Sequence, residues 1–557
     1  MDSIEQISAE EAAVPQGAQA EDRKKAGQRS FLARASMVVL LGTLTSRFFG
    51  FIREMVMAAY FGSGMAVDAF QVAYMIPNLL LQLFGSAAIG SAFIPVITTF
   101  LTNKEPENVN TVASSVANFL AVFFFLCMVA GFFIAPQVTR AIAPGYAGDV
   151  EKFRLTVLMT RVMFPSILFL GMSGFVMGML HSYNHFTAPA FAPVCFNILI
   201  ITSVVVLTRG LGPMSLAIGV TLGGLIQLLF QIPFLKKRNW RYSLTLAWHH
   251  PGVKQIITLF IPIVFSLASI EINVFVDTRF ASLLAAGSVA ALHYALRIWY
   301  LPMGLFAVTI STVLFPKFSR HSAMNDLAGL KESYSLGLRS VFLIMVPASM
   351  LIIVLARPIV KLLFMRGAFG MESTNAVAYA LVFYTLGLTS AGVLHLTNRA
   401  FYSLKDTLTP TLVTVAAIAV NYLGDWVLSR PLGHGGIALS TSLVMTFNFA
   451  CLFIILRRRM GDIDGRRILS SLIKILIASC LLGIVSYAAW RLTHSMAGDA
   501  LSGQILAVGT GTGAGALMYL AAAKILGIHE MSAITRMVLA RFTRRKGDPD
   551  DARTTEI

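Results

Sequence analysis

Apolar residues occur in this chain as long runs separated by short polar stretches, and about fourteen such runs lie between residues 36 and 525. A helix needs about 20 predominantly apolar residues to cross a bilayer. The pattern therefore predicts an all-α polytopic membrane protein with about fourteen transmembrane helices. We expect the spans near residues 36–58, 69–100, 112–134, 154–180, 188–208, 213–235, 254–283, 288–318, 337–356, 374–402, 409–429, 435–456, 468–490 and 502–525.

The composition supports the membrane class, because 56% of the 557 residues are hydrophobic and only 13% are charged, whereas soluble domains carry about 25% charged residues. The net charge of +17 raises the question of nucleic-acid binding. The basic residues, however, cluster in short loops beside apolar runs, as in Lys236-Lys237-Arg238 and Arg457-Arg458-Arg459. This is the pattern that orients membrane proteins. We therefore expect no nucleic-acid partner, both termini in the cytoplasm and an even number of spans.

An internal repeat divides the spans into two groups. Leu211-Gly212 recurs 221 residues later as Leu432-Gly433, and Pro77 recurs 225 residues later as Pro302. Helices 1–6 and 7–12 are therefore predicted to be two copies of one six-helix unit, and such parallel repeats form two lobes around a central site in transporters. Helices 13 and 14 are either an appendage or part of a substrate site. The expected organisation is a disordered cytoplasmic tail at 1–30, an N-lobe at 31–238, a C-lobe at 239–460, helices 13 and 14 at 461–530, and a basic cytoplasmic tail at 531–557.

Charged residues inside the apolar runs are the first candidate site. Arg47 and Arg53 lie on the first predicted helix and Arg297 lies in the second copy of the repeat, while Asp68 follows the first helix. Such residues are costly in a membrane unless they face a partner or a water-filled cavity. Because guanidinium groups bind phosphate oxygens in a bidentate manner, the arginines predict an anionic, phosphate-bearing substrate. Two alternatives stay open: Arg53 snorkels from a helix end, or Asp68 and Glu54 neutralise the arginines.

Oxygen-bearing side chains form a second candidate site, consisting of Asp277, Asn421, Asp425 and Thr441. Asn421 and Asp425 are four residues apart and so lie on one helix face. Carboxylate, amide and hydroxyl oxygens without Cys or His favour a hard cation, and sodium is the expected coupling ion. The alternative is structural: Asp425 pairs with Arg430, and Asp277 pairs with Arg279 or Arg297.

Enzyme chemistry finds little support in the sequence. The chain has no Walker loop, no GxSxG element, no HExxH motif and no His/Cys metal spacing. We therefore expect a protein that is not an enzyme and needs no cofactor. Without an ATP-binding motif, transport must draw on an ion gradient or on the membrane potential, which is worth about 2.3 kcal/mol per charge per 100 mV.

Several sequence motifs are distinctive. They are Ser46-Arg47-x-x-Gly50-Phe51-x-Arg53-Glu54, Phe61-Gly62-x-Gly64-Met65-Ala66-x-Asp68-Ala69-Phe70, Ile76-Pro77-Asn78-Leu79-Leu80, Ala192-Pro193 with Asn197, Arg366-Gly367-Ala368-Phe369 and the run from Arg399 to Thr407. Together they resemble the MurJ/MviN lipid II flippase family of the multidrug/oligosaccharidyl-lipid/polysaccharide exporter superfamily. The resemblance implies two six-helix lobes plus two extra helices. It also implies alternating-access translocation of the undecaprenyl-diphosphate-linked peptidoglycan precursor, lipid II, from the inner to the outer leaflet of the bacterial cytoplasmic membrane for cell-wall synthesis. The expected partners are this precursor, membrane lipids and cell-wall synthesis proteins, with the chain itself a monomer.

The resemblance also assigns roles to the candidate residues. Arg47, Arg53 and Arg297 fall on the family's cavity arginines, which are thought to hold the diphosphate, and Asp68 falls on its helix 2 aspartate. Asp277, Asn421, Asp425 and Thr441 resemble the sodium site described for some members. The chain departs from the family where an arginine pair and an acidic residue are usual, because Leu81, Gln82 and Ser86 stand there. This departure leaves open a different polyprenyl-diphosphate-linked oligosaccharide as cargo, or cation-coupled drug export.

Overall fold

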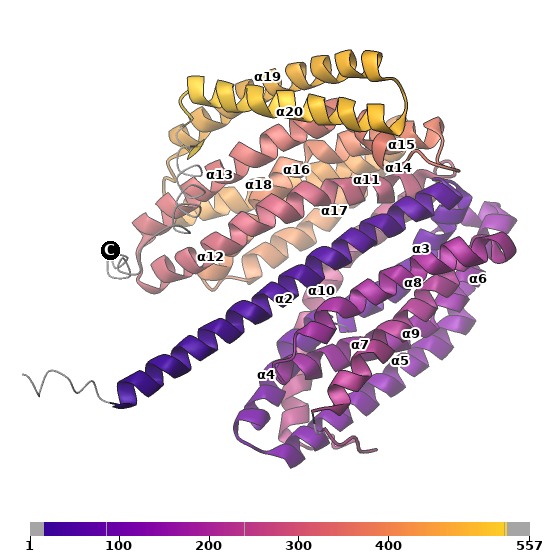
Figure 1. Ribbon diagram of the computed structural model, residues 1–557, viewed down its shortest axis with the longest axis vertical. Coiled ribbons are helices and arrows are strands. Elements are labelled where there is room, and N and C mark those ends of the chain that lie inside the picture. Colours follow the sequence, from indigo (N-terminus) through magenta and orange to yellow (C-terminus); the bar gives the residue numbers. More distant parts are fainter. Residues whose placement is uncertain (1–15, 85, 239, 529, 532–557) are drawn as a thin grey trace, which may run out of the picture. The chain divides into compact units, whose positions relative to one another are not determined.

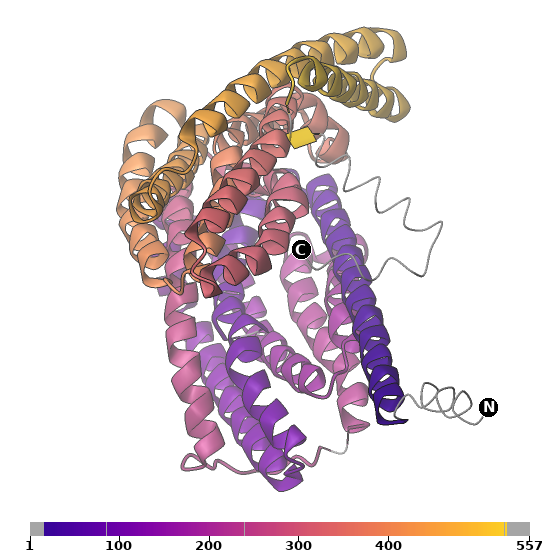
Figure 2. The same ribbon diagram turned by 90° about the vertical axis from the view of Figure 1, so that its left-hand side faces the viewer.

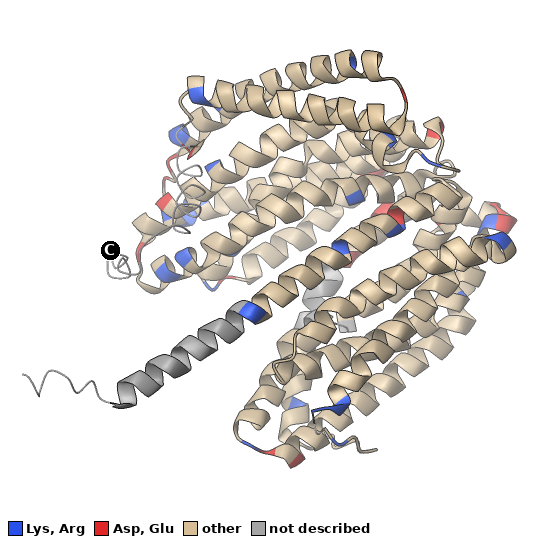
Figure 3. Cartoon of the chain, viewed as in Figure 1, with Lys and Arg blue, Asp and Glu red and all other residues tan. Residues whose placement is uncertain are grey.

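A computed structural model describes residues 16–84, 86–238, 240–528 and 530–531 of the chain, without the side chains of residues 16–33, 84, 86–88, 263 and 265–270. Within this part every regular element is a helix, which confirms the all-α prediction. Charged residues gather mainly at helix ends and in loops, and long stretches of helix between them carry none (Figure 3).

The helices follow one another with short connections, apart from the longer connection at residues 237–250 (Figure 1). In chain order they are α2 (Gln16–Phe61), α3 (Met65–Phe84), α4 (Ser86–Thr102), α5 (Pro106–Ile142), η1 (Pro144–Gly148), α6 (Val150–Met163), α7 (Pro165–Ser182), α8 (Thr187–Leu211), α9 (Met214–Lys236), α10 (Pro251–Ser282), α11 (Ser288–Pro302), η2 (Met303–Ala307), α12 (Val308–Ala323), α13 (Leu327–Val354), α14 (Ala356–Phe364), α15 (Met371–Leu386), α16 (Leu388–Ser403), α17 (Leu408–Leu432), α18 (His434–Met460), α19 (Gly465–Ala497) and α20 (Leu501–Ile525).

Eleven helical segments in the described part are long and apolar enough to cross a membrane, and α15 with α16 makes a twelfth if this pair, bent by 43°, is one span. The two remaining expected spans fall on α3–α4 and on α10, which are helical but include side chains outside the described part. The structure is therefore consistent with the predicted fourteen. α2 begins at Gln16, inside the predicted N-terminal tail, whereas residues 1–15 and 532–557 of the two tails lie outside the described residues.

Contacts between residues divide the chain into two compact units. Unit 1 comprises Met1–Val56, Ile76–Ile134 and Thr160–Phe265, and unit 2 comprises Met57–Met75, Ala135–Met159 and Ser266–Ile557. Within unit 2, the last two spans α19 and α20 pack side by side (Figure 2). The boundaries proposed for the N-lobe and the C-lobe stay a prediction.

The internal repeat is visible in the backbone at its best-matched position. Gly212 ends α8 with φ 54° and ψ −137°, and Gly433 ends α17 with φ 57° and ψ −136°. Each glycine accepts a left-handed conformation that favours residues without a Cβ. In both copies the glycine reverses the chain into the next helix, α9 or α18, which packs against the preceding one.

Candidate functional site

Arg53 lies on α2 and is held by buried partners within unit 1. Its Nη1 donates to Asn197 Oδ1 on α8 at 3.1 Å, and its Nη2 donates to Glu54 Oε1 at 2.7 Å. The Arg53 side chain is 18% exposed and that of Glu54 only 2%. Arg53 is eight residues from the end of α2 and is fixed in place, so it does not snorkel from a helix end. The guanidinium is positioned in advance by a carboxylate and an amide.

Asn197 is a functional candidate that the sequence argument included only as part of a motif. Its Nδ2 donates to the Pro193 carbonyl at 3.0 Å and lies 3.4 Å from the Ser46 carbonyl, so its Oδ1 is turned toward Arg53. The amide thereby ties α8 to α2. An asparagine in the middle of an apolar run was the available signal.

Arg47 differs from Arg53 because its side chain is exposed and makes no hydrogen bond or ion pair with the residues that the structure describes. Arg297, in unit 2, is half-buried on α11, and its Nε donates to His293 Nε2 at 3.3 Å. Arg47 and Arg53 therefore belong to one unit and Arg297 to the other. A single diphosphate site made from all three stays a prediction.

Asp68 pairs with a lysine, whereas the arginines were the alternative partners considered from the sequence, and its place in a substrate site stays a prediction. Its side chain is 1% exposed, and Oδ2 accepts from Lys152 Nζ at 2.7 Å. The carboxylate also caps the N-terminus of α11, because Oδ2 accepts from Gly287 N at 2.7 Å and Oδ1 accepts from Ala290 N at 2.8 Å. Such a cap satisfies free amide groups and places negative charge at the positive end of the helix dipole. Asp68 thus neutralises Lys152 and α11 in this conformation, and not the arginines.

The backbone beside Asp68 is packed too closely for larger residues. Gly287 has φ +91°, and a Cβ there would lie 2.4 Å from the Ser63 carbonyl oxygen. Gly62 has φ +64°, and a Cβ there would lie 2.7 Å from the Ala368 carbonyl oxygen. Both glycines belong to unit 2. They permit the chain after α2 to lie directly against the start of α11 and against the loop before α15.

The candidate cation site assembles from three helices of unit 2. Asp277 on α10 accepts from Asn421 Nδ2 on α17 at 2.9 Å and from Thr441 Oγ1 on α18 at 3.2 Å. Asp425 lies one turn beyond Asn421 and is 0% exposed. Its two carboxylate oxygens are buried without a hydrogen-bond partner among the described residues.

The structure does not show the ion pairs with arginine that were the alternative role for these carboxylates. Arg430 lies over the Trp426 ring, 4.5 Å from its centroid, and Arg279 donates to the Ala141 carbonyl at 2.8 Å. Among the described residues, neither Asp277 nor Asp425 has an ion pair. A buried carboxylate without a counter-charge is costly, and oxygen ligands suit a hard cation. The residues present therefore fit a sodium ion.

A cavity of about 400 Å³ adjoins this cluster within unit 2. Asp277, Asn421 and Thr441 form part of its wall, and Tyr402 and Thr411 form another part. Three further asparagines on the wall were not singled out from the sequence, although each interrupts an apolar run: Asn273, Asn398 and Asn448, whose Oδ1 atoms are buried without a hydrogen-bond partner in the described part of the chain. The cavity is thus lined by carbonyl oxygens that water or a cation would satisfy.

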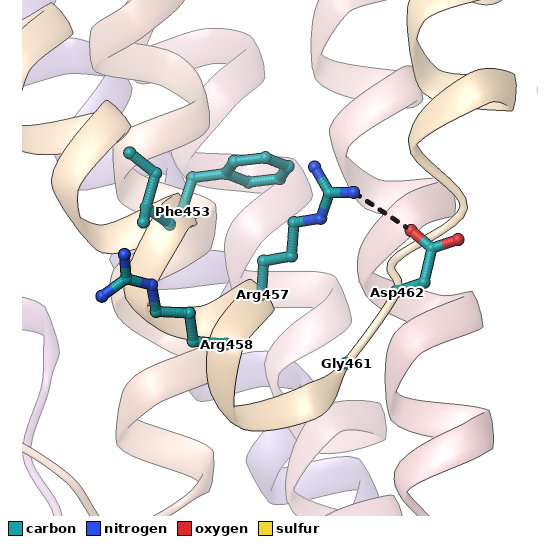
Figure 4. A pocket seen from close by; sticks show the side chains of 6 residues that line it. Phe453, Arg457, Arg458, Gly461 and Asp462 are labelled. Carbon is teal, nitrogen blue, oxygen red and sulfur yellow. Dashed lines mark ion pairs between the residues drawn. The ribbon is translucent and has the colours of Figure 1, made fainter.

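A second cavity, of about 380 Å³, lies at the end of α18 (Figure 4). Arg457 reaches across it toward Asp462, with the Nη2 to Oδ1 distance at 3.7 Å, and Phe453 lines the side nearer the middle of the helix. Both charged side chains are more than half exposed. Exposed pairs of this kind contribute little to stability, and this surface is separate from the candidate cation site.

The described residues offer groups that can bind an anion and a cation. They contain no group of three or more His, Cys, Asp or Glu side chains that would hold a transition metal. The features they offer are fixed guanidinium groups and an oxygen-only carboxylate cluster.

Comparisons with known proteins agree with this arrangement. A family model described as Lipid II flippase MurJ matches residues 57–505. The lipid II flippase MurJ of Burkholderia cenocepacia is 33% identical over 434 residues, which are 77% of this chain and 84% of the relative. A solved structure of lipid II flippase MurJ in an inward closed conformation aligns with a TM-score of 0.74 at 26% identity, covering 88% of this chain and 98% of that one. A multidrug resistance MATE family transporter of the MOP superfamily, in an inward-facing conformation, aligns with a TM-score of 0.64 at 16% identity over 77% of this chain and 99% of its own, which is a likeness of fold alone.

Proposed function

The chain belongs to the lipid II flippase MurJ family, and we propose that it moves lipid II, the undecaprenyl-diphosphate-linked peptidoglycan precursor, from the inner to the outer leaflet of the bacterial cytoplasmic membrane. The observation that carries the proposal is the family match over residues 57–505, which takes in both the Asp68 and the Asp277 clusters. Arg47 and Arg53 precede the matched range, and the motif around them supports their inclusion in the site.

The diphosphate would bind the arginines. Arg53 is already oriented by Asn197 and Glu54, so little side-chain entropy is lost when it binds an anion. Arg47 is exposed, and its guanidinium N–H groups make no hydrogen bond with the described residues, so they can donate to a ligand. Because a guanidinium group can bind two phosphate oxygens at once, these residues and Arg297 would hold the headgroup phosphates. They would do so while the protein converts from the inward-facing to the outward-facing state. The chain would act as a monomer with both termini in the cytoplasm, and it would carry out no bond-making reaction.

Sodium would supply the driving force at the Asp277 cluster. A sodium ion bound between Asp277 and Asp425 would offset one of their two negative charges, which otherwise repel each other across a poorly solvated space. Sodium moving inward down its gradient, together with the inside-negative potential, would reset the inward-facing state. Each charge that crosses contributes about 2.3 kcal/mol per 100 mV.

A second candidate keeps the fold and changes the cargo to another polyprenyl-diphosphate-linked oligosaccharide. The observation that favours it is the replacement of the family's arginine pair by Leu81 and Gln82. Losing two positive charges from α3 weakens recognition of an anionic headgroup. Because both cargoes carry the diphosphate, this difference concerns only which oligosaccharide is carried.

Rescue of bacteria depleted of their own lipid II flippase tests the proposal. Cells that express this chain should grow and should display lipid II on the outer leaflet. Cells that express Arg297→Ala at the same membrane level should do neither. Growth failure with the wild-type chain at normal membrane levels would contradict the proposal, and rescue of an O-antigen flippase mutant in its place would favour the second candidate.

A further inference from the structure

The first turns of α5 carry a polar stripe that the transport function does not explain. Asn108, Asn110, Ser114, Ser115 and Asn118 occur within the first thirteen residues of this apolar helix. Most of them are spaced by three or four residues and so share one side of the helix. Polar side chains on a membrane-spanning helix need hydrogen-bond partners in place of lipid.

The partner of the stripe is the segment 240–250, which follows α9. Arg241 N donates to Asn110 Oδ1 at 3.0 Å, and Ser243 N donates to Ser114 Oγ at 3.1 Å. Farther along α5, Asn118 Nδ2 donates to the carbonyls of residues 243 and 245 at 3.0 and 2.9 Å.

The segment then returns toward the start of α5. The amide of residue 247 donates to Ser115 Oγ at 3.0 Å, and the His250 ring lies 3.2 Å from Asn108 Oδ1. The segment therefore runs along α5 and doubles back. From Asn108 to Asn118 it follows the helix for about 15 Å. We call residues 240–250 the α5 hairpin.

The α5 hairpin alternates apolar and polar residues, and four of its apolar or aromatic side chains are exposed, while the Tyr242 hydroxyl also donates to Asn118 Oδ1 on α5 at 2.6 Å. Leu244 at the turn is 90% exposed, Tyr242 is 55%, Leu246 is 49% and Trp248 is 45%. Its two arms are fixed by aromatic contacts, with Trp240 packed on Phe175 and Trp248 on Phe119. The exposed row is thus held in place by rigid contacts along both arms.

The charge next to the α5 hairpin is entirely basic. Lys236, Lys237, Arg238 and Arg241 are exposed, and residues 235–250 include no Asp or Glu. Aromatic and leucine side chains beside lysine and arginine are typical of segments that lie in the interface of an anionic leaflet. An irregular backbone is tolerated at that depth only where protein satisfies its polar groups, and the polar stripe of α5 does this for the hairpin.

We propose that the α5 hairpin is a membrane-interface anchor, whose residues Tyr242, Leu244, Leu246 and Trp248 insert at the boundary between headgroups and acyl chains of an anionic leaflet. The anchor fixes the connection between α9 and α10 at the membrane surface. It does not depend on which cargo the protein carries.

Depth-resolved fluorescence of the full chain in liposomes tests this. In a background with Cys127, Cys195, Cys451 and Cys480 replaced by serine, Leu244→Cys is labelled with an environment-sensitive fluorophore. Liposomes of phosphatidylglycerol and phosphatidylethanolamine contain acyl chains brominated near the headgroup. We expect blue-shifted emission that brominated lipid quenches and aqueous iodide does not. The matched control is Asn103→Cys in the exposed polar loop before α5, where iodide should quench and brominated lipid should not.

Two further variants test the cause. Asn118→Ala removes the hydrogen bonds that hold the turn and should reduce quenching of the Leu244→Cys label by lipid. Lys236→Gln with Lys237→Gln should reduce it in anionic liposomes more than in neutral ones. Quenching of the Leu244→Cys label by iodide alone would overturn the proposal. Protection from both quenchers would also overturn it, because a protein surface and not lipid would then cover the tip.

Discussion

Replacing Lys152 by methionine tests whether the Asp68 contacts hold this conformation together. The substitution keeps much of the side-chain volume but removes the positive charge 2.7 Å from a carboxylate that is 1% exposed. Asp68 would then keep only the amides of Gly287 and Ala290. Leaving a buried charge without its partner costs about 3–5 kcal/mol. The helix dipole of α11 offsets at most about 2 kcal/mol, so we expect a net loss of a few kcal/mol.

The converse substitution should have a similar cost. Asp68→Asn leaves Lys152 buried, although its Nζ still lies 4.0 Å from the centroid of the Tyr146 ring, and such a contact contributes up to about 2 kcal/mol when desolvated. The double variant removes both charges and leaves neither uncompensated. Its destabilisation should therefore be smaller than the sum of the two single changes, by about 0.5–3 kcal/mol.

The assay is the free energy of unfolding in mixed micelles titrated with sodium dodecyl sulfate, followed by near-ultraviolet circular dichroism. Glu151→Gln is the matched control, because this exposed neighbour of Lys152 has no hydrogen bond or ion pair within the described residues through its side chain, and it should change stability by less than about 0.5 kcal/mol. Additive single changes, or a Lys152→Met variant as stable as this control, would refute the reasoning.

Three further outcomes are expected. Asp425→Asn should abolish the rise in melting temperature that sodium produces in the wild-type protein, and a wild type indifferent to sodium would exclude the cation site. Arg297→Ala should stop transport in proteoliposomes while its membrane level stays normal, and full activity would exclude a role in binding the diphosphate. The Lys361 ammonium, which donates a hydrogen bond to Asp499, lowers the pKa of that exposed carboxyl below its usual range. Its contribution is therefore present above pH about 4 and is lost as the pH falls through the lowered pKa; the melting temperatures of wild type and Asp499→Asn should converge on acidification, and a difference that stays constant down to pH 3 would be contrary to this.

The helical architecture could be predicted from the sequence because each span has its own apolar run, and the length of the run is set by the bilayer. The repeat could be predicted for a similar local reason. Gly212 and Gly433 are 221 residues apart and adopt the same backbone conformation. Because this conformation favours glycine, the two glycines mark equivalent points of the two copies.

The partners of the charged residues were harder to predict. Asp68 and Lys152 are 84 residues apart, and no spacing rule connects them. Asn421 and Asp425 could be assigned to one face of a helix, but the contact of Asn421 with Asp277 depends on how α10 packs against α17. The assignment of these residues to sodium stays a prediction.

The α5 hairpin shows a further limit. Its hydrogen bonds join side chains of α5 to backbone groups of residues 241–247. Because every residue type other than proline offers the same backbone groups, the sequence does not show which of them are bound. The stripe from Asn108 to Asn118 was visible in the sequence, but nothing in the sequence identified the segment that it binds.

Transport by the purified protein tests the proposed cargo most directly. The full chain is reconstituted in liposomes with fluorescent lipid II, and an enzyme added outside cleaves only the headgroups that have reached the outer leaflet. We expect the wild-type chain to expose lipid II faster than Arg297→Ala does, and faster than it exposes a polyprenyl-diphosphate-linked O-antigen unit. Equal exposure of lipid II by wild type and by protein-free liposomes, or selective exposure of the O-antigen unit, would contradict the assignment.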